Sequence, residues 1–69
     1  MNLNEKFNVL VDRKEIKNVV ALQVSVDRVN PDNAENNKVT IWYRASHEEN
    51  SPVRALTVEL GSVRFEAAN

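Results

Sequence analysis

The side chains best suited to acid–base or metal chemistry are neighbours in the chain: His47, Glu48 and Glu49. A catalytic or metal site needs such groups to converge in space, whereas adjacent residues of a strand point to opposite faces. A polar segment that ends in proline, residues 50–52, follows directly and is typical of a turn. We therefore interpret residues 47–52 as a solvated loop and predict no metal site there.

A second group of possible metal ligands lies in the segment 30–37, where the side-chain oxygens come from Asn30, Asp32, Asn33 and Glu35. A calcium loop of the helix–loop–helix kind needs a glycine in mid-loop and a bidentate glutamate at its end, and this segment has neither. The segment also contains Pro31, which cannot donate to a strand ladder. We interpret it as an exposed connector between strands.

The composition argues against an enzyme. The chain has no cysteine, which excludes thiolate nucleophiles and thiolate metal ligands. Its single glycine, Gly61, excludes both the Gly-x-Ser-x-Gly nucleophile elbow and the glycine-rich loops that bind phosphates. We therefore predict a protein that is not an enzyme and has no cofactor.

The most suggestive surface lies in the segment 39–44, where Thr40, Trp42 and Arg44 alternate with Val39, Ile41 and Tyr43. If the apolar set faces the core, Trp42 lies outside it and beside Arg44. Exposed tryptophan and arginine are the residues most enriched in binding hot spots. The predicted partner-binding residues are Trp42, Arg44, Thr40 and Arg64. The alternative is that Trp42 belongs to a second core layer and that Tyr43 lies near the surface.

The elements that would position these residues are strands. Val-rich or alternating segments predict strands over residues 6–12, 19–29, 38–46 and 54–66, since side chains branched at Cβ favour an extended backbone. Asn- and Glu-rich breaks separate them. We predict an all-β fold, a small antiparallel sheet of four to five strands arranged as a meander or a small open barrel. The 69 residues form a single domain, 1–69.

Two features of this prediction have alternatives. Asp12 could cap a helix with Glu15 three residues later, which would give an α+β fold with one short helix near residues 13–22. In the last segment, the inward-facing positions change phase at Gly61. We favour a β-bulge there, with a tight turn at residues 60–62 that divides the segment in two as the alternative.

Charge and hydropathy bound the function. The net charge of −1 is unlike the basic excess of most nucleic-acid modules, and the chain has no apolar run long enough for a membrane span. The polar N-terminal residues lack the layout of a signal peptide, and we expect a cytoplasmic protein. A chain of this size without disulfides buries little surface, so we expect a homo-oligomer or a subunit of a larger assembly.

We therefore predict a protein–protein interaction module, or a small regulatory or inhibitor subunit, that binds through an exposed sheet face or edge and self-associates. Its small size also suits a protein from a virus or mobile element. The alternative is a single-stranded nucleic-acid-binding β-barrel, in which Trp42 stacks on a base and arginines reach the phosphates. The arginines that could do so are Arg28, Arg54 and Arg64.

Overall fold

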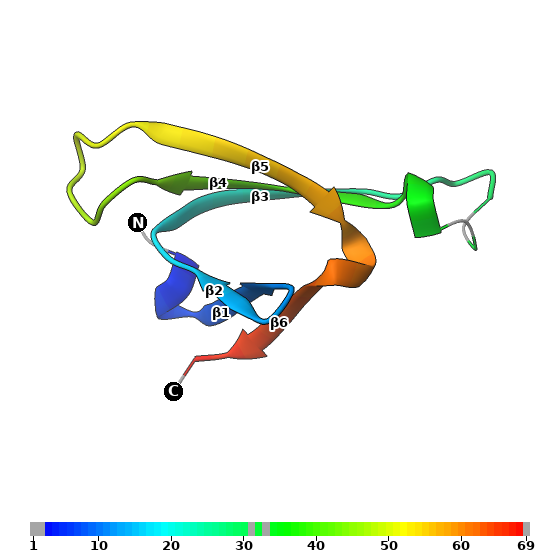
Figure 1. The fold of residues 1–69 in the computed structure, drawn as a ribbon, viewed down its shortest axis with the longest axis horizontal. Helices are drawn as coiled ribbons and strands as arrows, with labels where there is room; N and C mark the ends of the chain where they lie inside the picture. Colours follow the sequence, from blue (N-terminus) through cyan, green and yellow to red (C-terminus); the bar gives the residue numbers. More distant parts are fainter. Residues whose placement is uncertain (1–2, 31, 33, 69) are drawn as a thin grey trace.

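The computed structural model describes residues 3–30, 32 and 34–68, which form two three-stranded antiparallel sheets that face one another (Figure 1). The first sheet has the order β2-β1-β6 and contains β1 (Phe7–Val11), β2 (Lys14–Ile16) and β6 (Val63–Ala67). The second has the order β3-β4-β5 and contains β3 (Val19–Ser25), β4 (Lys38–Arg44) and β5 (Val53–Glu59). Three short 3-10 helices complete the elements of the described residues: η1 (Leu3–Glu5), η2 (Ala34–Asn36) and η3 (Leu60–Ser62). The all-β prediction is confirmed. The described residues contain six strands in two sheets, in place of the predicted single sheet of four to five strands in a meander or small open barrel.

The core lies between the two sheets. Its fully buried members are Val9 from β1, Val19 from β3, and Val39 and Ile41 from β4. Because strand side chains alternate between faces, each of these residues points from its own sheet toward the other one. Partly buried apolar residues pack around this cluster, namely Leu3, Phe7, Val11, Ile16, Leu22, Tyr43, Leu60 and Val63.

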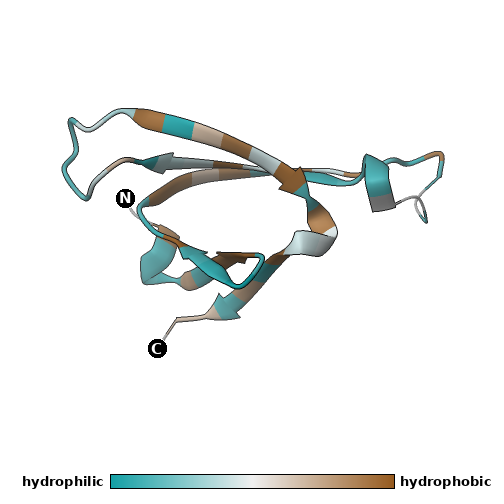
Figure 2. Ribbon diagram, in the orientation of Figure 1, coloured by the Kyte–Doolittle hydropathy of each residue, from teal (hydrophilic) through white to brown (hydrophobic). Residues whose placement is uncertain are grey.

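The molecule is more elongated than a typical chain of its length. Its principal extents are 40 × 26 × 18 Å and its radius of gyration is 12.8 Å, against about 11 Å expected for a compact domain of this size. Figure 1 shows why: the loops at the two ends of the β3-β4-β5 sheet project beyond the smaller sheet. In the second half of β5 the partly buried Leu56 and Val58 alternate with the exposed Thr57 and Glu59, so hydrophobic and hydrophilic positions follow one another there (Figure 2), as a strand with one buried face requires.

The alternative of a helix near residues 13–22 is wrong, because that segment contains β2, a turn and the first part of β3. Asp12 and Arg13 have positive φ angles of 49° and 72° and join β1 directly to β2, with Val11 opposite Lys14. This is the geometry of a two-residue type I′ hairpin, which a helix N-cap at Asp12 cannot adopt. A third positive φ, 60° at Asn18, turns the chain from β2 into β3.

The β-bulge predicted at Gly61 is also wrong. β5 ends at Glu59, and η3 carries the chain from one sheet to the other before β6 begins at Val63 (Figure 1). Gly61 does not have a positive φ, and a Cβ atom added to it would meet nothing within 4 Å. The irregular pairing lies instead in β3, where the register with β4 shifts between Val19 and Ala21. The phase change along 54–66 therefore marks a change of sheet.

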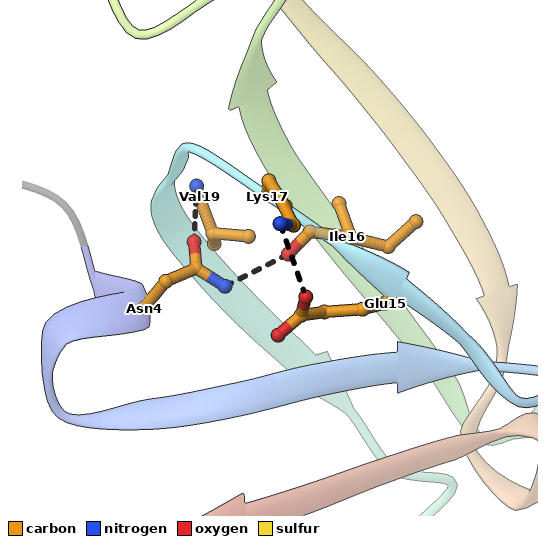
Figure 3. Close-up of polar contacts among 5 residues, drawn as sticks. All are labelled: Asn4, Glu15, Ile16, Lys17 and Val19. Atoms are coloured by element: carbon orange, nitrogen blue, oxygen red, sulfur yellow. Dashed lines mark hydrogen bonds and ion pairs between the residues drawn. The ribbon is translucent and has the colours of Figure 1, made fainter. Parts of the chain in front are cut away.

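A single amide fixes the other corner between the sheets (Figure 3). The Asn4 side chain donates from Nδ2 to the carbonyl oxygen of Ile16 at 2.8 Å and accepts at Oδ1 from the backbone N–H of Val19 at 2.9 Å. It thereby pairs one backbone acceptor from the end of β2 and one donor from the start of β3. Beside it, the Nζ of Lys17 lies 3.8 Å from a carboxylate oxygen of Glu15, an exposed ion pair of little energetic weight.

Replacing Asn4 with alanine is expected to destabilise the fold by about 1–3 kcal/mol, since two partly buried backbone groups lose their partner. Asn4→Asp should not restore the stability, because it places a carboxylate oxygen against the carbonyl of Ile16. Urea unfolding measures the effect. As a control, Asn50→Ala in the exposed 45–52 loop should stay within about 0.5 kcal/mol of wild type. Equal stabilities for Asn4→Ala and Asn50→Ala would show that the amide does not hold the corner.

Arg13→Gly is expected to stabilise the protein by about 0.5–1 kcal/mol, because a left-handed backbone is unfavourable for arginine and open to glycine. Asp-Gly is also a preferred pair for a type I′ turn. Arg13→Lys is the matched control: it keeps the charge and the Cβ atom and should leave the unfolding midpoint unchanged. A glycine variant no more stable than the lysine variant would contradict the type I′ assignment.

Candidate partner-binding surface

Trp42 lies on the outer face of the β3-β4-β5 sheet. It is opposite Ala21 of β3 and Ala55 of β5, and directly opposite residues of an antiparallel pair share a face. The adjacent Ile41 points inward and is fully buried. The indole is partly buried, flanked across both strands by side chains of a single methyl group. Both neighbours are small, and part of the ring remains exposed between them.

Thr40 and Arg44 share this outer face with Trp42, since all three occupy alternate positions of β4. The hydroxyl of Thr40 lies 3.0 Å from that of Thr57, its opposite residue on β5. Nη1 of Arg44 donates to the carbonyl oxygen of Ser51 at 3.0 Å and so helps to hold the loop between β4 and β5. Thr40 and Arg44 therefore have structural contacts of their own beside Trp42. We call Thr40, Trp42 and Arg44, with Ala21 and Ala55, the Trp42 surface.

The alternative placement of the two large β4 aromatics differs from the structure. Tyr43 lies opposite Val19 and packs against the buried cluster. Trp42, one residue earlier, must face the other way. Of this pair, the tyrosine supports the core and the tryptophan belongs to the outer surface.

Arg64 does not join the other three predicted residues. It lies on β6 opposite Leu10, whereas the next residue, Phe65, lies opposite the core residue Val9. Arg64 therefore occupies the outer face of the β2-β1-β6 sheet. The two outer faces point away from each other, so one flat partner on the Trp42 surface does not reach Arg64.

The residues first considered for acid–base or metal chemistry stay in loops. His47, Glu48 and Glu49 are exposed between β4 and β5. Across residues 3–30, 32 and 34–68, no three His, Cys, Asp or Glu side chains gather in a way that could hold a metal ion. The helices of this part of the chain have three residues each, far too few to span a membrane.

The loop between β3 and β4 is organised by Asp27, a residue that no sequence motif marks. Its Oδ1 accepts from the N–H groups of Val29 at 2.9 Å and Asn30 at 3.0 Å, and its Oδ2 accepts from Nδ2 of Asn36 at 2.8 Å. Its own N–H donates to Oδ1 of Asn37 at 2.9 Å. The carboxylate thus stabilises the conformation of this loop through three hydrogen bonds. Of the possible metal ligands in segment 30–37, Asn33 lies outside the described residues. The other three, Asn30, Asp32 and Glu35, are exposed.

The hydrogen bonds from Asn30, Asn36 and Val29 lower the pKa of Asp27 below its ordinary value of 3.8. The ordering that this carboxylate provides is therefore fully present above the ordinary value and is lost as the pH falls through the lower, folded-state pKa. We expect the Val29 and Asn30 amide resonances to move together in that acidic range in an NMR titration. Asp27→Asn should abolish this titration, and unchanged amide shifts in wild type would contradict the assigned bonds.

Comparisons with protein-family models, with curated proteins and with solved structures gave no match.

Proposed function

We propose that the protein is a non-enzymatic interaction module that binds a protein partner through the Trp42 surface. The observation that carries this proposal is the position of Trp42, a partly buried indole on the solvent face of a sheet, between Ala21 and Ala55. The buried cluster is formed by other residues. A tryptophan so placed is a typical hot-spot residue, because a partner that covers the exposed part of its ring removes that apolar surface from water.

The polar groups around Trp42 suit burial under a partner. The Thr40 and Thr57 hydroxyls already pair with each other, so a partner that covers them leaves neither without a hydrogen bond. The Arg44 guanidinium has one donor engaged with Ser51 and carries further N–H groups that can meet a carbonyl or carboxylate. A flat face with one aromatic anchor and a polar margin is the usual anatomy of a protein interface.

A single-stranded nucleic acid is the less favoured partner, because the arginines that would reach its phosphates are dispersed. Arg54 lies opposite Tyr43 and therefore on the inner face of its sheet, the face opposite to the Trp42 surface. Arg64 lies on the other sheet. Nucleic-acid binding depends on several cations along one groove and weakens steeply with salt. Adding oligonucleotides at low salt is therefore expected to leave the fluorescence of Trp42 unchanged. Salt-sensitive quenching would favour the nucleic-acid reading.

Trp42→Ala is expected to weaken partner binding by more than about 1 kcal/mol while the chain stays folded, since the ring contributes little to the core. The measurement compares the proteins retained by immobilised wild type and variant from lysates, followed by titration of each retained protein. Leu10→Ala is the matched control, because it removes an apolar side chain from the outer face of the other sheet. A folded Trp42→Ala protein that binds every partner as tightly as wild type would exclude this surface.

A further inference from the structure

The two sheets leave an apolar groove open along one side of the core. It has a volume of about 310 Å³, and four apolar side chains line it: Phe7, Leu22, Val24 and Phe65. The rings of Phe7 and Phe65 meet edge to face, with centroids 5.8 Å apart. Val24 and Phe65 lie opposite the core residues Val39 and Val9, so they point inward, yet they are 51% and 45% exposed. These inward-facing side chains lack a covering layer.

One side of the groove is formed by β3, an edge strand with no charged residue. Within the described chain, β3 has β4 as its only strand neighbour, and the edge strands β2, β5 and β6 each carry at least one acidic and one basic residue. β3 carries neither, and residues 18–26 form a run without charge, proline or glycine. Charged side chains and proline are the usual protection of an edge strand against pairing. Beyond its start, where the Val19 N–H is bonded to Asn4, β3 therefore has an uncharged pairing edge beside an uncovered apolar groove.

The surface area of the molecule indicates how large the missing cover is. The accessible surface is 5239 Å², whereas a compact monomer of 7.9 kDa exposes about 4,400 Å². The difference, about 800 Å², is the area that each partner buries in a protein interface of standard size. Projecting loops account for part of this excess, and the half-exposed Val24 and Phe65 beside the groove contribute apolar surface to it.

We propose that a second copy of this chain covers the groove, with β3 of one copy paired antiparallel to β3 of the other about a two-fold axis. In an isologous contact, β3 of one copy lies against β3 of the other copy. Like charges on the two strands would repel each other, and β3 has no charged residue. The net charge of −1 adds little repulsion between whole chains. Both grooves then lie on the same side of the joined sheet, where Val24 and Phe65 of each copy cover those of the other.

This pairing uses the edge and inner side of β3, and so it does not depend on the Trp42 surface. It would give a six-stranded sheet whose outer face carries two Trp42 surfaces, with the two β4 strands about 14 Å apart at three strand spacings. A dimer of this kind presents its partner-binding surface twice.

The test is sedimentation equilibrium of the full chain, wild type and Val24→Lys, from micromolar to millimolar concentration. Val53→Lys is the matched control, because Val53 is 48% exposed and lies on β5, the opposite edge of the same sheet. We expect a wild-type dimer, a Val24→Lys dissociation constant raised at least about 100-fold since the two-fold axis counts each substitution twice, and little change in Val53→Lys. Trp42→Ala should also leave the dimer intact.

Hydrogen exchange of wild type provides a second measurement that does not depend on a variant that folds. Raising the protein concentration should slow exchange in residues 19–25 and leave residues 53–59 unchanged. A wild-type monomer throughout, which would leave the groove to a different occupant, overturns the proposal. So does a dimer weakened by Val53→Lys or Trp42→Ala but not by Val24→Lys, or one that protects β5 in place of β3.

Discussion

The packing of Val9 with Val19, Val39 and Ile41 is the contact that holds the two sheets together. Each fully buried aliphatic side chain contributes about 1.5–3 kcal/mol, so the loss of any one would affect the whole fold. The corners of the structure exist to maintain this contact. Asn4 fixes the turn from β2 into β3, and η3 carries β5 into β6, so that both sheets present their valines to the same interior.

The small core does not bury all the large apolar side chains of the protein. The positions of those that remain partly exposed suggest which contacts the protein makes. Trp42 lies on an outer face, where a sheet with alanine neighbours forms a flat platform. Val24 and Phe65 point inward from opposite sheets and remain about half exposed, because the groove between the sheets is open beside them. The first arrangement suits an outside partner and the second suits completion of the core. The two proposed contacts can therefore be made at the same time.

The local part of the fold could be predicted from the sequence. The alternation over residues 39–44 correctly separates Ile41 from Trp42, because a period of two is a property of the strand alone. What depends on distant residues could not be predicted. The phase change at Gly61 records a change of sheet, and Arg64 is separated from Trp42 because β6 pairs with β1. At Arg13, a positive φ in a residue that disfavours it is imposed by the hairpin.

The candidate site also has a part that could be predicted from the sequence and a part that could not. Thr40, Trp42 and Arg44 share a face because they share a strand, so their grouping is visible in the sequence. Their neighbours Ala21 and Ala55 come from strands whose register only the structure provides. The groove is harder still to predict from the sequence, since Phe7 and Phe65 come together with Leu22 and Val24 only when the two sheets pack. The uncharged run over residues 18–26 was the one sequence signal that could have indicated it.

The central claim is that this chain completes its apolar core by association. The most direct measurement is the urea midpoint of the wild-type protein as a function of protein concentration, followed by circular dichroism. If folded chains associate through apolar surface, mass action raises the midpoint steadily with concentration. A midpoint that is the same at all concentrations would contradict the claim, because it would show a monomer that is stable without a partner.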